Sequence, residues 1–228
     1  MIANRQLILP YAAPYLAYVG IASIPATYLA ADLGYLLRLI VVPLLLAWGW
    51  RWYCPLRGPR SLRGSVGVGA VAGLLGLVVW LALLTPFASA ADAQHWTTRA
   101  FFLRLLSAGL VVPVFEELMM RGFIFRLALQ WDNARKDGKP DPLHAALDER
   151  SVSAVAPGAW SWAAVIVSTL AFASGHAVHE WPAALAYGLL MAGLWINRKD
   201  LIACITAHAV TNVALACFVY ATGSWQYW

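Results

Sequence analysis

Charged residues are scarce in this sequence. Asp, Glu, Lys and Arg together make up 12% of its 228 residues, against roughly 25% in soluble globular domains. Hydrophobic residues reach 61% instead, and the mean hydropathy is +0.67. The shortage of charge excludes an ordinary soluble domain. The apolar residues lie in runs long enough to cross a lipid bilayer, which takes about 20 residues for each helix, so the sequence predicts an integral membrane protein.

Cysteine is scarce as well. The three cysteines, Cys54, Cys204 and Cys217, are an odd number and form no CxxC pair or zinc-knuckle pattern. This pattern excludes a disulfide framework, and we expect neither a metal nor another cofactor. The net charge of +5 does not indicate a nucleic-acid partner. The basic residues lie in short loops between apolar runs, a distribution that reflects membrane topology.

Seven apolar runs are candidate membrane spans. Because the runs are continuous and not alternating, they predict helices and not the strands of a barrel. We therefore expect an all-α fold, a polytopic membrane bundle of about seven transmembrane helices. The predicted spans cover residues 9–31, 33–52, 65–86, 100–130, 159–178, 182–197 and 201–221. We interpret residues 1–98 as N-terminal transmembrane helices and residues 99–228 as a second helical unit that forms the core of the protein.

The loops between these runs alternate in charge. Loops 31–34, 85–98, 177–181 and 222–228 contain no Lys or Arg. The other set contains Arg5, Arg51, Arg57, Arg60, Arg63, Arg126, Arg135, Lys136, Lys139, Arg150, Arg198 and Lys199. Lys and Arg are retained in cytoplasmic loops, so seven spans place the N-terminus inside. We expect a multi-pass protein of the cell membrane, with the lipid bilayer as a partner.

One long polar stretch, residues 131–158, interrupts the apolar runs. Asp, Lys, Pro and Ser are interleaved in it, and such a composition does not bury a core. We expect this stretch to be a solvated cytoplasmic loop.

Ionisable residues inside membrane spans cost on the order of 2.5–3.5 kcal/mol each on insertion scales, which makes them functional candidates. Glu116, Glu117 and Arg121 lie in the fourth span. Glu117 and Arg121 are four residues apart, so they share a helix face and are expected to form a structural ion pair. Glu116 is rotated about 100° away and lacks that partner, which favours a role as proton acceptor for water.

Two histidines and an asparagine lie at a similar predicted depth. His176 lies in the fifth span, and His208 and Asn212 lie four residues apart in the seventh. Counted from the cytoplasmic helix ends at 1.5 Å per residue, Glu116, His176 and Asn212 lie about 21–24 Å up, with His208 one turn lower. We expect the four side chains to converge, with His208 and Asn212 able to stabilise an oxyanion.

Four other polar residues of the spans are interpreted as structural. Arg38 and Arg104, each alone in its span, are expected to pair with a neighbour or to extend toward the membrane surface. His179 and Glu180 stand beside Trp181 at the outer end of the fifth span, where interfacial residues are expected.

The motifs EExxxR, FxxxH and HxxxN follow one another on successive apolar runs between about residues 100 and 220. Together they resemble the motifs of the CPBP family, the type II CAAX endopeptidases or ABI family of CAAX proteases and bacteriocin-processing enzymes. The resemblance implies an intramembrane glutamic endopeptidase that needs no metal. It also implies a membrane-associated peptide or protein substrate, prenylated or not.

The resemblance further implies roles for single residues. These are Glu116 and His176 as activators of the attacking water, His208 and Asn212 as the oxyanion site, and Glu117 and Arg121 as supporting residues. The segments VVPVFEE, CITAHAVTN and ATGSWQYW are similar to a bacterial branch, the CAAX prenyl protease-related proteins of exosortase systems. The preference for 13 Arg over three Lys also fits a bacterium, and hence its inner membrane.

Two alternatives remain open. A glutamate and two histidines could hold zinc in a metalloprotease, although HExxH is absent and His176 and His179 do not share a face with Glu116. A non-catalytic membrane protein, such as an immunity factor, a scaffold or a proton-coupled carrier, could use Glu116 as a relay. A carrier usually shows internal repeats, and the sequence contains none.

Overall fold

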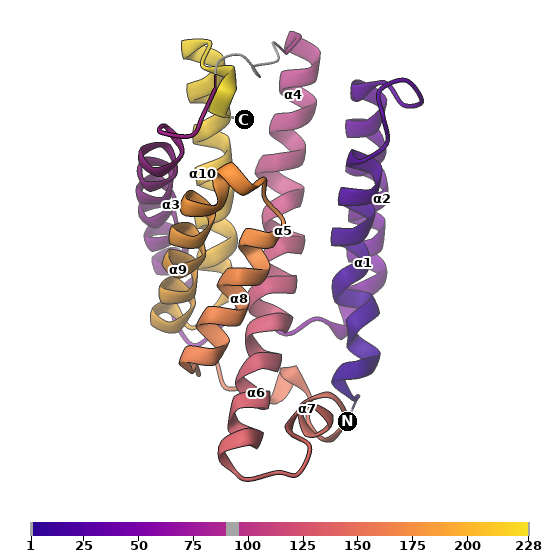
Figure 1. Cartoon of the computed structure of the whole chain (residues 1–228), viewed down its shortest axis with the longest axis vertical. Helices are drawn as coiled ribbons and strands as arrows, with labels where there is room; N and C mark the ends of the chain where they lie inside the picture. The colour runs from indigo at the N-terminus through magenta and orange to yellow at the C-terminus, as the bar shows by residue number, and fades with distance from the viewer. Residues whose placement is uncertain (1, 90–95, 228) are drawn as a thin grey trace.

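The computed structural model describes residues 2–89 and 96–227 and shows an elongated bundle of helices (Figure 1). These residues contain no strand, which confirms the predicted all-α class. The helices are α1 (Asn4–Ala22), α2 (Ala31–Gly49), α3 (Leu62–Leu84), α4 (Thr98–Leu106), α5 (Val112–Glu117), α6 (Phe125–Lys136), α7 (Pro142–His144), α8 (Trp162–Ser174), α9 (Trp181–Arg198) and α10 (Leu201–Thr222). Shorter 3₁₀ and π segments connect or interrupt them. These are η1 (Trp50–Trp52), η3 (Ser107–Val111), η4 (Leu118–Ile124), η5 (Ala145–Glu149), η6 (Val152–Ala154), η7 (Val178–Glu180) and η8 (Trp225–Tyr227).

Each of the seven predicted spans overlaps a helix. Three helical segments in the described part of the chain are long and apolar enough to cross a membrane, namely Ala31–Trp52, Leu62–Leu84 and Leu201–Thr222. Trp162–Ser174 is apolar but shorter. The protein is therefore a helical bundle with segments that are able to span a membrane. The count of seven crossings and the side of the N-terminus stay predictions.

The first helix ends earlier than its predicted span. The span was expected to reach residue 31, but α1 ends at Ala22. Pro25 follows within one turn, and a proline has no N–H to donate and disfavours helical geometry in the residue before it. Pro10 and Pro14 lie inside α1.

The fourth predicted span is part of a continuous helical stretch over residues 98–136, made of α4, η3, α5, η4 and α6. At 1.5 Å per residue it is about 58 Å long. The two π segments, η3 and η4, lie on either side of α5, whose last two residues are Glu116 and Glu117. A π turn widens a helix by one residue and is frequent at functional sites.

Helix α9 buries one face against its neighbours and exposes the other, on which Leu189 lies. Tyr187, Met191 and Trp195 are at most 2% exposed. Phe125 of α6 packs edge-on against Trp195, with 6.4 Å between the ring centroids. The aromatic and aliphatic side chains of α9 thus form the core on which α3, α6, α8 and α10 pack.

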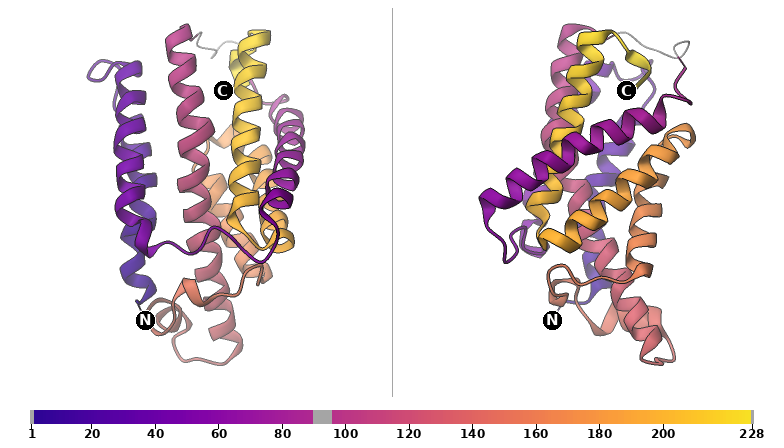
Figure 2. Two further views of the ribbon diagram at one scale, coloured as in Figure 1. Left: turned by 180° about the vertical axis from the view of Figure 1, so that it is seen from behind. Right: turned by 90° about the vertical axis from the view of Figure 1, so that its left-hand side faces the viewer.

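Helix α3 crosses α10 obliquely (Figure 2), and glycines make this crossing possible. Gly69 and Gly73 are buried in the contact. A Cβ atom on Gly73 would lie 2.5 Å from the Ala207 carbonyl oxygen and 2.8 Å from Cβ of Val210. Small residues let membrane helices approach closely enough for backbone contact, so the N-terminal helices pack directly on the core and do not stand apart from it.

Replacing Gly73 by alanine is expected to destabilise the bundle by roughly 1–3 kcal/mol, because the helices must move apart. Gly67 lies on the same helix, and nothing is within 4 Å of its would-be Cβ. There the same substitution should be neutral or stabilising, since alanine is favoured over glycine in a helix by about 1 kcal/mol. Thermal unfolding of both variants in detergent checks this. Equal shifts in melting temperature would contradict the close-contact role of Gly73.

The segment 131–158 is more ordered than the solvated loop that its composition predicts, although residues 135–141 are exposed. Helix α6 extends into it, short helical turns follow, and Ala146 and Val152 are fully buried. Asn4 of α1 holds the segment in place. Its Nδ2 donates to the Ala146 carbonyl and to Gln130 Oε1, both at 2.7 Å, and its Oδ1 accepts from the Val152 N–H at 2.7 Å. Composition failed as a guide because polar side chains here satisfy buried backbone groups.

Candidate active site

A cavity of about 220 Å³ lies inside the bundle, between α4–α5, the turn after α8, α9 and α10. All four predicted catalytic residues line it, namely Glu116, His176, His208 and Asn212. The sequence placed three of them at one depth and His208 one turn lower, and the structure brings all four around one cavity. The supporting pair, Glu117 and Arg121, lies behind the cavity wall.

The predicted ion pair between Glu117 and Arg121 is present, and both side chains are 0% exposed. Arg121 Nη1 donates to Glu117 Oε1 at 3.2 Å, and Nη2 donates to the Gly188 carbonyl at 3.1 Å. The same Glu117 oxygen lies 3.1 Å from His208 Nδ1. Glu117 therefore does more than pair with Arg121, because it also fixes the position of His208, which lines the cavity.

This contact determines how His208 faces the cavity. Glu117 is paired with a guanidinium, so its carboxylate accepts a hydrogen bond from His208 Nδ1–H, and Nε2 of the ring is left on the cavity side. Nε2 lies 3.8 Å from Glu116 Oε2, which is longer than a hydrogen bond. With its Nδ1–H committed, His208 can donate to an oxyanion only through Nε2–H of the protonated ring.

Asn212 is positioned by a carbonyl that the helix cannot satisfy. In η3 the Val112 N–H bonds five residues back, to the Ser107 carbonyl. The next acceptor in that register, Ala108, would need the N–H of residue 113, which is proline and has none. Asn212 Nδ2 donates to the Ala108 carbonyl instead, at 2.8 Å. One amide N–H and the amide oxygen of Asn212 stay available to the cavity.

His176 does not lie in a helix, contrary to prediction. Helix α8 ends at Ser174, and His176 lies in the turn that follows Gly175. The Nδ1 of His176 lies 3.0 Å from the Phe172 carbonyl. A carbonyl only accepts, so Nδ1 carries the proton and Nε2 is left as a proton acceptor. Phe172, the first residue of FxxxH, thus orients the histidine through its backbone.

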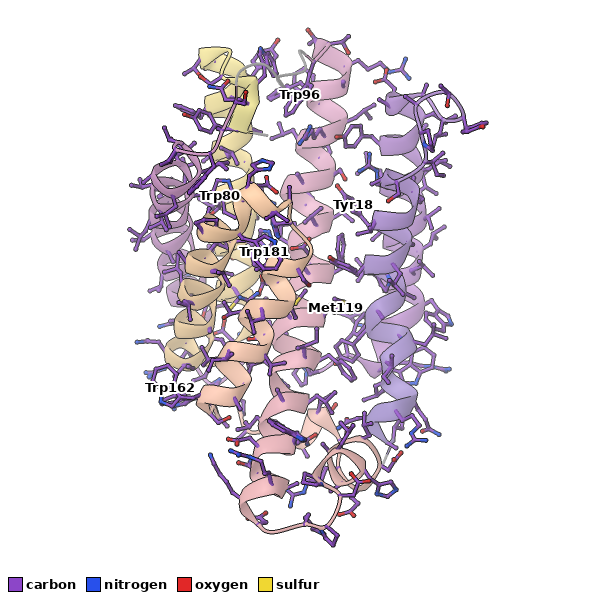
Figure 3. The ribbon with its side chains drawn as sticks, in the orientation of Figure 1. Tyr18, Trp80, Trp96, Met119, Trp162 and Trp181 are labelled. Atoms are coloured by element: carbon purple, nitrogen blue, oxygen red, sulfur yellow. The ribbon has the colours of Figure 1, made fainter. Side chains whose placement is uncertain are left out.

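Aromatic side chains fix the histidine turn from several sides. The His176 ring lies 4.7 Å from that of Phe172 and 5.4 Å from that of Trp80, measured between centroids. Trp181 Nε1 donates to the His176 carbonyl at 3.3 Å, and the Tyr15 hydroxyl occupies the space beside Gly175. Figure 3 shows Trp80 and Trp181 close together near the turn. Two of these contacts come from α1 and α3, which carry none of the motifs.

Sequence reasoning missed several residues that line the cavity. Arg104 and Glu180, expected to be structural or interfacial, both belong to its wall. Tyr18, Trp80 and Tyr187 belong to it as well. One local signal could have found Arg104. The lining residues of the long helix are 104, 108, 112 and 116, and a spacing of four fits a helix widened by a π segment.

A metal site needs several His, Cys, Asp or Glu side chains around one point. No group of three or more His, Cys, Asp or Glu side chains within residues 2–89 and 96–227 has an arrangement that could hold a metal ion. The polar groups present are suited instead to moving protons and to donating hydrogen bonds.

The chain is thus a helical bundle with carboxylates and imidazoles around a cavity, an arrangement suited to proton transfer. The chain belongs to the type II CAAX prenyl endopeptidase Rce1-like family, whose model matches residues 98–214. The match includes all three motifs and confirms the resemblance found in the sequence. The family consists of membrane proteases that act on peptide substrates. No curated protein and no solved structure matches the chain.

Proposed function

We propose that the protein is an intramembrane glutamic endopeptidase that hydrolyses a peptide bond of a membrane-associated peptide or protein. The observation that carries the proposal is the convergence of Glu116, His176, His208 and Asn212 on one cavity in a chain of a protease family. Hydrolysis needs a proton acceptor for water and donors for the oxyanion, and these four side chains supply both.

Glu116 is the proposed general base. Its side chain is 15% exposed, toward the cavity, and its nearest ion-pair partner is His208 Nε2 at 3.8 Å. A water between Glu116 and the Nε2 of His176 can give its proton to the carboxylate while its oxygen attacks the carbonyl carbon of the scissile bond. The same proton then passes to the leaving amine, as general acid–base catalysis requires.

Asn212 and His208 are the proposed oxyanion donors. Asn212 offers its second amide N–H from a position fixed by Ala108, and His208 offers Nε2–H when its ring is protonated. Glu117 holds that ring through Nδ1. Donors fixed before the reaction stabilise the developing charge without reorganisation, and one such donor contributes roughly 2.7–4 kcal/mol in known hydrolases.

The purified protein is expected to cleave a fluorogenic membrane peptide in detergent at the same rate before and after exhaustive chelation. The reason is that proton transfer by Glu116 needs no Lewis acid. The zinc alternative predicts the opposite result, because a metal would then generate the nucleophile. A loss of activity on chelation, restored by zinc and not by other divalent ions, would support the metalloprotease instead.

The substrate itself can be found with the inactive protein. Peptides that accumulate uncleaved in membranes of a strain carrying Glu116→Gln, compared with wild type by mass spectrometry, are its candidates. Prenylated and unlipidated peptides are distinguished directly by their masses. The expected setting, a bacterial inner membrane, is part of this proposal.

A further inference from the structure

The cavity extends from Glu116 and His208 toward one end of the bundle only. On α10 its lining begins at His208 and continues toward the C-terminus to Leu215, and Tyr227 follows beyond the helix. The C-terminal end of α10 lies at the upper end of the bundle in Figure 1, opposite to the N-terminus and α7.

The long helix gives the same direction. Its lining residues lead from Glu116 back to Arg104, and α4 begins beside the C-terminal end of α10 (Figures 1 and 2). Glu180 and Trp80 complete the wall at this level. In Figure 3, Trp80, Trp96 and Trp181 lie in the upper half of the bundle, whereas Trp162 lies in the lower half.

Packed side chains close the other end. Immediately below Glu116, Glu117 and Arg121 are 0% exposed. Met191 and Trp195 of α9 are at most 1% exposed, and the segment 131–158 covers the end of the bundle with its buried residues. A peptide therefore cannot reach Glu116 from that end without opening the core.

Basic residues gather at the closed end. Twelve of the 16 Lys and Arg residues belong to the basic loops named above, and these loops join the helices at the lower end of Figure 1. The end toward which the cavity extends is called the open end. Arg99 lies there, one residue after loop 85–98, and its Nε is paired with Asp32 Oδ2 at 3.2 Å. Retention of Lys and Arg inside the cell makes the closed end cytoplasmic.

We propose that this site takes its substrate from the extracytoplasmic face. The substrate would be a membrane-bound polypeptide that displays its scissile bond in the outer half of the bilayer, and not a chain end presented from the cytoplasm. Trp80, Phe172 and Leu215 in the wall suit apolar side chains beside that bond. That a bond is cleaved at this site rests on the proposed peptidase function. The side of the membrane on which the cavity opens can be tested without any cleavage.

The test uses single cysteines and a charged, membrane-impermeant maleimide. Cys217 is exposed, whereas Cys54 and Cys204 are buried, so Cys217→Ser provides the background. Val112→Cys places a thiol in the cavity wall. Thr222→Cys marks the open end and Ser153→Cys the closed end, and both positions are exposed. Labelling is measured in spheroplasts of a bacterial host and in inverted membrane vesicles.

We expect the Val112→Cys and Thr222→Cys proteins to be labelled in spheroplasts, and the Ser153→Cys protein only in inverted vesicles. Labelling of the Val112→Cys protein only in inverted vesicles, or in neither preparation, overturns the proposal. Ala108→Cys, at a second wall position, gives the same readout if the Val112→Cys protein does not fold. Labelling needs no catalysis, so an inactive but correctly labelled protein would contradict the peptidase proposal and leave this one intact.

Discussion

Replacing Glu116 by glutamine is expected to lower the rate of peptide cleavage by about 10²–10⁴-fold, the range that general acid–base catalysis contributes. Glutamine keeps the size and the hydrogen-bonding capacity of the side chain but cannot take a proton from water. The fold should survive, because the nearest ion-pair partner of Glu116 lies 3.8 Å away, beyond hydrogen-bond distance. Initial rates with a fluorogenic membrane peptide measure the loss, and thermal unfolding verifies the fold.

Glu180 provides the matched control for this substitution. It lines the same cavity, but its Oε2 accepts the Ala177 N–H at 2.9 Å and so caps a helical turn, which a glutamine oxygen can also do. Any loss from Glu180→Gln should be far smaller than that from Glu116→Gln. Wild-type cleavage by the Glu116→Gln protein would disprove the mechanism. A cellular phenotype that survives this change, with no cleavage of any peptide, would favour a non-catalytic membrane protein.

The parts of the site that sequence reasoning predicted correctly depend on one helix at a time. Glu117 and Arg121 form their ion pair because residues four apart in a helix face each other. The matching depth of Glu116 and Asn212, with His208 one turn lower, follows from the rise of a helix, and the apolar runs indicated which segments are helical. Such features need no knowledge of how the helices pack.

The parts that could not be predicted depend on local irregularity. The π segment η3 shifts the hydrogen-bond register before Pro113, and only then does the Ala108 carbonyl need a donor from α10. His176 lies in a turn, because α8 ends two residues earlier. A periodic pattern assumes regular helices and therefore misplaces residues at these points. The widened turns lie beside Glu116, which fits their frequency at functional sites.

Contacts between distant segments were beyond sequence reasoning as well. Trp80 of α3 and Tyr15 of α1 hold the turn of His176, although both helices lie outside the part of the chain that matches the family model. The link from Glu117 to His208 joins two motifs that are 91 residues apart. Helical spacing identified Glu117 only as the partner of Arg121, and so it missed the orienting role.

That orienting role leads to a second large effect. Glu117→Leu leaves the Arg121 charge buried without its partner, which should destabilise the protein by about 3–5 kcal/mol. It also removes the acceptor of His208 Nδ1–H. Cleavage should therefore fall by about 10–100-fold, the loss found when the outer-shell partner of a metal-ligating histidine is removed. Denaturant unfolding in detergent and initial cleavage rates measure the two effects separately.

The double variant Glu117→Leu with Arg121→Met distinguishes two roles of Glu117, the structural pairing with Arg121 and the orientation of His208. Apolar replacement of a whole buried ion pair is often neutral or stabilising, so most of the lost stability should return. The part that does not return is the hydrogen bond that Arg121 donates to the Gly188 carbonyl. Cleavage should stay low, because leucine cannot accept from His208. If activity instead recovered together with stability, Glu117 would be a structural clamp alone, and the orientation of His208 would need another source.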